Sequence, residues 1–171
     1  MSTTLTTSVK ASINWNYQSA VSGIANTSNV SSFTYSKSFA DGTGPDQADL
    51  LYLTVGTLAP SASISLDLDG VLEDLFGNTL SMARIKAVYI QNSNDEGSTK
   101  LIVGGDPNAL VNWVGNASDV VNVRNNGVLF LSAPDAIGYV VTPGTGDVLL
   151  LTNGDGSNSA LYKVAVLGAS L

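Results

Sequence analysis

The sequence predicts an all-β protein, a single domain built as an antiparallel β-sandwich or barrel. Apolar and polar residues alternate with a period of two along most of the chain, the pattern of strands with one buried face. Turn-forming Gly, Asn and Pro residues separate about ten short apolar segments at fairly even spacing. The length of 171 residues suits one domain with a core that needs no disulfides.

The first half of the chain is expected to form four strands. Residues 9–17 alternate without error, with Val9, Ala11, Ile13, Trp15 and Tyr17 on one side, which indicates a half-buried strand. Residues 33–39 repeat the pattern, with Lys37 interrupting the apolar side. After a turn or loop at 41–47, residues 50–55 are apolar on both faces, as in a central strand, and 64–68 alternate again.

The second half continues in the same way. The expected strands are 84–92, 100–103, 120–123, 127–132, 137–141, 147–152 and 161–168. NGDGSNS, residues 153–159, is expected to be a hairpin turn between the last two strands. Helix is expected for about one turn each, near 71–75 and 107–112.

The chain shows no linker and no repeat of fixed period, so one sandwich is expected over residues 9–171, preceded by a polar N-terminal arm over residues 1–8. The N-terminus lacks a basic segment followed by an apolar one, and the chain lacks a run of 18 apolar residues. We therefore expect neither an export signal nor a membrane partner.

Charge argues against nucleic acid as a partner. The net charge is −7, and the seven bases are scattered: Lys10, Lys37, Arg84, Lys86, Lys100, Arg124 and Lys163. No basic stripe exists to neutralise phosphates. Charged residues make up 12% of the chain, about half the usual share. A surface so poor in charge suits a subunit packed against others, and equally an ordinary all-β protein with neutral polar faces.

The densest group of acids is SISLDLDGVLEDLFGN, residues 63–78, which places Asp67, Asp69, Glu73 and Asp74 within eight positions. A calcium loop of EF-hand type needs a closing Glu, and here leucines separate the first acids and no Glu closes the loop. The pattern favours a strand end with Asp67 and Asp69 facing solvent, a turn at Asp69-Gly70, and acids in the first turn of a short helix. We expect no metal site.

The sequence offers few residues of the types that enzymes use for catalysis. There are no histidines and no cysteines, so the commonest general base, the thiolate nucleophile and most transition-metal ligands are lacking. Nothing marks a carboxylate pair for glycoside hydrolysis, and Gly104-Gly105 precedes Asp-Pro rather than a phosphate-binding helix. We expect no enzyme, no catalytic residue and no cofactor.

The aromatic residues raise the question of a binding surface. Trp15, Trp113, Tyr17 and Tyr35 could stack against sugars, but the position of Trp15 on the apolar side of its strand favours packing in the core. Trp113 lies between turn signals and suits either an exposed anchor for a partner or a lid on the end of the sandwich. Trp113 and Leu5, an apolar residue of the polar arm, are the candidate partner contacts.

Several segments of the chain resemble small virion proteins of tailed bacteriophages. They are DLDGVLEDLFGNTLSMARIKAVYIQN, KLIVGG, NNGVLFLSAPDAIGYVV, DVLLLTNGDG and ALYKVAVLG, which together span roughly residues 50 to 168. The matching positions are turn and core positions, so the resemblance transfers no functional residue.

The resemblance implies a jelly-roll-like sandwich that is located in the virion and has a structural role. The role expected first is a capsid decoration or cement subunit that stabilises the shell, and a tail component is also compatible. The implied partners are further copies of the chain, with a trimer as the family's pattern, and the major capsid protein or another virion protein. The alternative is a carbohydrate- or receptor-binding sandwich module, lectin-like, on the virion or tail.

Overall fold

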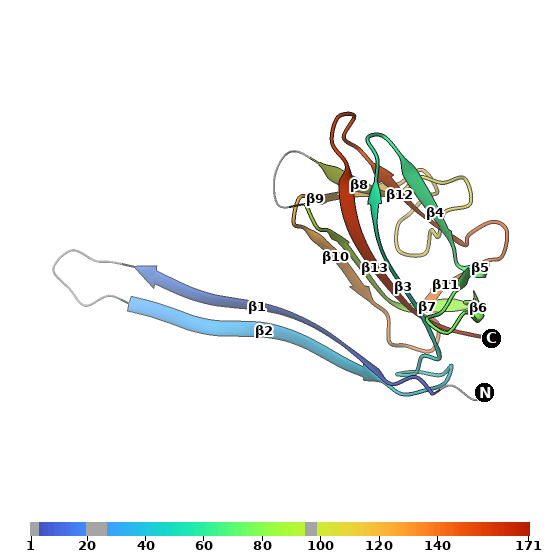
Figure 1. Cartoon of the computed structure of the whole chain (residues 1–171). Coiled ribbons are helices and arrows are strands. Elements are labelled where there is room, and N and C mark those ends of the chain that lie inside the picture. Colours follow the sequence, from blue (N-terminus) through green and yellow to red (C-terminus); the bar gives the residue numbers. More distant parts are fainter. Residues whose placement is uncertain (1–3, 20–26, 95–98) are drawn as a thin grey trace.

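The computed structural model describes residues 4–19, 27–94 and 99–171. A sandwich of antiparallel sheets makes up the body, and a two-stranded hairpin projects from one end of it (Figure 1). None of these residues is helical, so no described segment is a helix that could cross a membrane. The one-turn helices expected near 71–75 and 107–112 are wrong, because residues 71–73 belong to a strand and the remainder lie in turns and loops.

A five-stranded and a four-stranded sheet form the sandwich. The first sheet has the order β10 (Val128–Ser132), β7 (Arg84–Asn92), β13 (Ala160–Ala169), β3 (Leu50–Leu58), and the short β11 (Tyr139–Val140) also pairs with β7. The second sheet has the order β4 (Ser63–Asp67), β12 (Val148–Asn153), β8 (Lys100–Gly104), β9 (Val120–Arg124). A small ribbon of β5 (Asp69–Glu73) and β6 (Thr79–Ser81) lies beside them.

The pairing of these eight strands is nested. β3 pairs with β13, β4 with β12, β7 with β10, and β8 with β9, each pair antiparallel. The outermost strands in the sequence therefore pair with each other, as do the innermost, and successive pairs alternate between the two sheets. This is the connectivity of a jelly roll, and it confirms the expected fold class.

The core lies between the inner faces of the two sheets. Its largest fully buried side chains include Leu66, Ile85, Ile90, Leu101, Leu149 and Leu151. Every strand expected from the alternating pattern is present, whereas β5 and β6 were not expected. The segment 153–159 is not a hairpin turn: it connects β12 in the second sheet with β13 in the first.

The projecting hairpin, which we call the arm, consists of β1 (Thr7–Ser19) and β2 (Thr27–Phe39). Its two strands pair from Thr7 with Phe39 to Ser19 with Thr27, and 13 residues in each strand give a length of roughly 40 Å. The interpretation of residues 9–17 as a half-buried strand is wrong, because most of this strand is exposed on the arm. The expected boundary between residues 8 and 9 lies within β1.

The base of the arm is anchored on the outer face of the first sheet. Phe39 is buried together with Ala48, Ala87 and Leu167, and Leu5, Val9 and Leu51 pack against this group. The loop 40–49 that follows β2 is closed by a hydrogen bond of 2.9 Å from the Ala48 amide to the Ala40 carbonyl. The arm therefore leaves the sandwich from a fixed, apolar base.

A buried lysine holds the loops around this base. Lys86 of β7 is fully buried, and its Nζ donates to the carbonyl oxygens of Gly44, at 3.2 Å, and of Asp135. Burial lowers the pKa of its ammonium group, and the neighbouring guanidinium of Arg84 lowers it further. Lys86 thereby ties the loop after β2 to the loop after β10.

Replacing Lys86 by Met is expected to destabilise the protein by about 1–3 kcal/mol, because the carbonyls of Gly44 and Asp135 lose a charged donor. Thermal or urea unfolding measures the effect. Lys10→Met is the matched control, since Lys10 is exposed on the arm, and its effect should stay within about 0.5 kcal/mol. Equal stabilities of the two variants would contradict the bridging role of Lys86.

Candidate functional site

The arm has one apolar face. Directly paired residues of an antiparallel ribbon point to the same side, and the register pairs Ala11 with Tyr35, Ile13 with Phe33, and Trp15 with Ser31. The large side chains of both strands therefore gather on one face: Ile13, Trp15, Tyr17, Phe33 and Tyr35. The other face is mainly polar and carries Lys10, Ser12, Asn14, Asn16, Gln18, Ser28, Val30, Ser32, Thr34 and Ser36.

This apolar face is largely open to solvent. Ile13, Tyr17 and Phe33 are 70%, 76% and 75% exposed. Trp15 is half-buried: its ring lies 5.0 Å from that of Phe33, and its Nε1 donates to Asn29 Oδ1 at 2.6 Å. The expectation that Trp15 packs in the core is wrong. A two-stranded ribbon without a second layer is only marginally stable in water, so a face of this composition calls for a cover.

The first sheet also exposes apolar side chains on its outer face. Its β3, β13, β7 and β10 place Leu53, Ala165, Tyr89 and Phe130 in one row across the sheet. Exposed apolar residues of this face, which we call the open face, include Leu53, Val55, Tyr89 and Val128. The outer face of the second sheet is more polar, with Ser63, Ser65, Asp67, Asn122 and Thr152 beside the half-buried Ile102 and Leu150.

The arm and the open face meet at the base of the arm. The ring of Tyr35 lies 6.4 Å from that of Phe130, and the hydroxyls of Tyr35 and Ser132 share a hydrogen bond of 2.9 Å. A groove of about 230 Å³ separates β1 from the sheet here, lined by Val9, Leu51, Ala165 and Leu167 among others.

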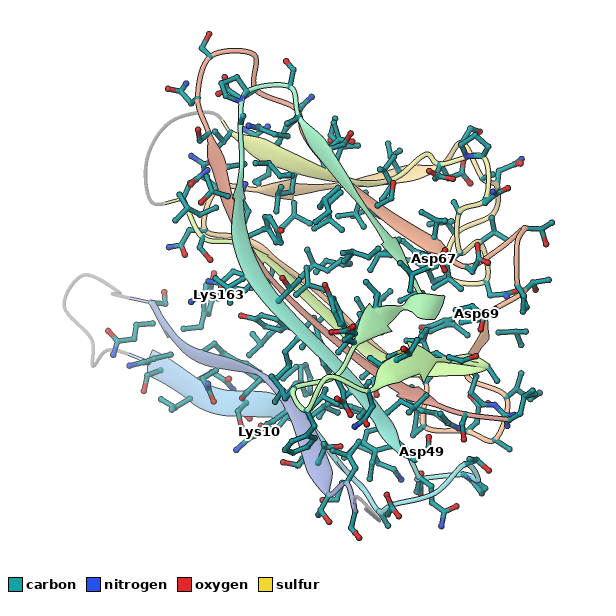
Figure 2. All side chains as sticks on the ribbon, turned by 45° about the vertical axis from the view of Figure 1, so that its right-hand side comes forward. Lys10, Asp49, Asp67, Asp69 and Lys163 are labelled. Atoms are coloured by element: carbon teal, nitrogen blue, oxygen red, sulfur yellow. The ribbon has the colours of Figure 1, made fainter. Side chains whose placement is uncertain are left out.

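The apolar face of the arm and the open face meet at the base of the arm, and we call them together the concave apolar surface. Figure 1 shows the arm and the sandwich diverging from this base. Lys163 of β13 is the charged residue that the open face contributes, in one row with Val55 and Val128. Figure 2 shows it on the side of the sheet that the arm faces.

Charge is divided unevenly between the arm and the sandwich. Residues 1–39 contain Lys10 and Lys37 and no acid, a net charge of +2, so residues 40–171 carry five bases and 14 acids, a net charge of −9. Lys37 forms an ion pair of 2.7 Å with Asp46 at the base. The arm is thus a weakly cationic, aromatic extension of an acidic body.

Of the acid cluster Asp67, Asp69, Glu73 and Asp74, three carboxylates accept local hydrogen bonds, and Glu73 is exposed. Asp67 and Asp69 are half-buried at the edge of the sandwich, while Leu66 and Leu68 are buried (Figure 2). Asp67 Oδ1 accepts the amide of Asp69 at 3.0 Å, and Gly70 has a φ of 85°. The strand end expected here is confirmed, since β4 ends at Asp67, but the turn lies at Leu68, and Asp69 and Gly70 begin β5. Among the described residues, no group of three acids gathers in metal-binding geometry.

Asp74 is a turn residue and not part of a helix. Its Oδ1 accepts the amides of Phe76 and Asn78, both at 2.8 Å, and its Oδ2 accepts Asn78 Nδ2 at 2.9 Å. These hydrogen bonds, with the side chain of Asn78 first, lower the pKa of Asp74. Asp135 is similar: the amides of Gly138 and Ile137 lower its pKa. Both carboxylates stabilise loops in their charged form, so this contribution is lost as the pH falls below about 4.

A second groove, of about 680 Å³, opens at the end of the sandwich near β11. Its lining is mainly apolar and includes Met82, Ile137 and Val140. The polar groups at its rim are already paired: Arg84 donates to the Ala136 carbonyl at 3.2 Å, and Asp69 accepts from the Ser81 hydroxyl.

The two predicted partner contacts lie in different places. Trp113 is half-buried against the main core, and its Nε1 donates to the Leu110 carbonyl at 2.6 Å, the position of a lid on one end of the sandwich. Leu5 is half-buried against the base of the arm, and its amide donates to Asp41 Oδ1 at 2.9 Å. Neither lies on the exposed part of the concave apolar surface. A role for them in partner contact stays a prediction.

Sequence reasoning missed Ile13 and Phe33 as surface residues. One signal in the sequence could have set this segment apart: no acid precedes Asp41. The strand length of 13 residues, more than twice the usual length of about 5–6, is visible only in the structure, because the alternation predicts strands at 9–17 and 33–39.

The melting temperature is expected to be the same in calcium and in chelator, because Asp67, Asp69 and Asp74 of the acid cluster already accept hydrogen bonds from the protein itself. A site filled at 100 times its Kd adds about 2.7 kcal/mol, which would raise the Tm by roughly 5–10 °C for a chain of this size. Differential scanning calorimetry measures this, and a calcium-dependent rise of that size would restore the metal hypothesis.

No family model, curated protein or solved structure matches the chain. A jelly roll serves many unrelated functions, so the fold alone does not indicate what the chain does. The concave apolar surface is the feature that does indicate a function.

Proposed function

We propose that the chain is a non-catalytic structural subunit that works by binding protein surfaces through its arm and open face. The observation that carries this proposal is the row of exposed aromatic and aliphatic side chains on the arm. Large apolar patches on a folded chain mark interaction sites. Aromatic residues are also the residue type most enriched where interfaces gain their binding energy.

The specific role that we propose is a capsid decoration or cement subunit of a tailed bacteriophage, located in the virion. The resemblance of residues 50 to 168 to small virion proteins supports this assignment. The jelly roll is compatible with it, since viral capsid domains are among the proteins that use this fold. A projecting arm suits a cement subunit, because it extends the reach of a small domain across a neighbour.

The residues do not favour catalysis. The sequence has neither histidine nor cysteine. The carboxylates with shifted pKa values, Asp74 and Asp135, are occupied by amides of their own loops. The proposed role therefore assigns these acids to the structure of the loops.

The alternative is a lectin-like module, which the aromatic face of the arm also suits. Trp15, Tyr17 and Tyr35 lie on one face, and aromatic rings stack well against apolar surfaces of a ligand. A sugar site also needs convergent polar groups that fix orientation. The arm supplies mainly Asn29 and Ser31 on that face, and the Asn29 carbonyl already accepts the Trp15 indole. Protein is therefore the preferred partner.

Binding to the shells of the phage that encodes the chain tests the proposal. Wild-type protein is expected to co-sediment with shells that lack it and to raise the temperature at which they open. The double variant Tyr17→Ser with Phe33→Ser should bind at least tenfold more weakly, because two exposed aromatic anchors are worth over 1.4 kcal/mol together.

Ser12→Ala with Thr34→Ala is the matched control, since these residues lie on the opposite face of the same strands and should bind shells like the wild type. Failure of the wild type to bind or stabilise shells would contradict the cement role. Saturable binding to a glycan array that is lost in the Tyr17 and Phe33 variant would favour the lectin instead.

A further inference from the structure

We infer that the concave apolar surface is an interface between copies of this chain, in which the arm of one copy lies against the open face of another. The inference rests on the proposed structural role, since it names the partner of the same surface. The occupant is a second copy because the chain itself carries two apolar surfaces that are matched in area and length.

The areas are sufficient for a stable contact. An aromatic side chain offers about 150–250 Å², so the exposed fractions of Tyr17, Phe33 and Tyr35, 76%, 75% and 40%, leave roughly 300–500 Å² on the arm. Leu53, Val55, Tyr89, Val128 and Leu161 of the first sheet are 36% to 74% exposed and offer a comparable area. Two arm-to-sheet contacts, one given and one received by each copy, then exceed the roughly 1,000 Å² that a specific interface needs.

The dimensions of the two surfaces also agree. The exposed apolar part of the arm runs from Ala11 to Tyr17, which is about 20 Å at 3.3 Å per residue. The open face is four strands wide, about 15–20 Å including the side-chain margins. An arm laid across the sheet would therefore cover its width, with both strands of the ribbon in contact.

Net charge disfavours direct contact between two bodies. The segment 1–39 carries +2, and the remainder of the chain carries −9, so two bodies in contact would repel each other. The contact between arm and sheet is itself apolar, because Lys10 lies on the polar face of the arm and Lys37 is already paired with Asp46.

Covering the arm also solves its own stability problem. A two-stranded ribbon with one aromatic face gains a second layer when it lies on a sheet, and burying one side chain such as Phe33 contributes about 1.5–3 kcal/mol. Because each copy both gives an arm and receives one, the contacts close in a dimer or in a ring such as a trimer.

Cysteine cross-linking of the full chain tests the inference directly. The sequence contains no cysteine, so introduced thiols report the designed contact alone. Phe33→Cys on the arm is mixed with a mass-tagged Val55→Cys on the open face and oxidised. A covalent heterodimer is expected in a yield at least fivefold above that of the control mixture of Thr34→Cys with tagged Val55→Cys.

Thr34 is adjacent to Phe33 but faces the other side of the arm, so the control keeps the same strand and reach. Equal yields from the two mixtures would overturn the inference. In parallel, light scattering of the wild type should give a dimer or trimer, and the Tyr17→Ser, Phe33→Ser variant should give a monomer with unchanged circular dichroism. A wild type that stays monomeric up to its solubility limit would also overturn it.

These results are separable from the shell experiment. If the chain binds shells but stays monomeric in their absence, the proposed structural role holds and the contact between the arm of one copy and the open face of another is contradicted. If the chain cross-links between copies but does not bind shells, that contact holds and the cement role is contradicted.

Discussion

The register between β1 and β2 is the constraint on which the rest of this molecule depends. Because Ile13 lies opposite Phe33 and Ala11 opposite Tyr35, the large side chains of both strands share one face of the arm. A shift of one residue would send the side chains of one strand to the other face, and neither face would then be apolar enough to bind. The register thus turns two alternating segments into one amphipathic surface.

The jelly roll holds the arm and its apolar face in position. Nested pairing of β3 with β13 and of β7 with β10 builds the first sheet, whose inner face forms half of the core while its outer face stays apolar. Phe39, Val9 and Tyr35 fix the base of the arm on that outer face. Lys86 secures the surrounding loops. The open face and the arm therefore share one packed base.

The sequence alone predicted the strands well, because alternation and turn residues are local properties. Residues 84–92, for example, coincide with β7. Alternation of apolar and polar residues predicts a strand with one apolar face, but it does not indicate which part of the molecule covers that face. For this reason the sequence predicts that Trp15 packs in the core, whereas Trp15 lies on the arm. The strand end at Asp67 was predictable because alternation is local, whereas the turn lies at Leu68, and Asp69 and Gly70 begin β5. The burial of Lys86 and of Asn153, whose amide donates to three carbonyls, depends on distant loops and left no signal in the sequence.

Amide hydrogen exchange in β1 and β2 tests the central claim, that the apolar face of the arm is covered by another copy, most directly. The measurement is made on the wild type at a series of concentrations that spans its association. The account predicts that protection of the arm amides rises with concentration, in step with protection at the open face, while the core strand β12 of the second sheet stays equally protected throughout. Arm protection that is independent of concentration, with an open face that exchanges alike in every sample, would contradict it.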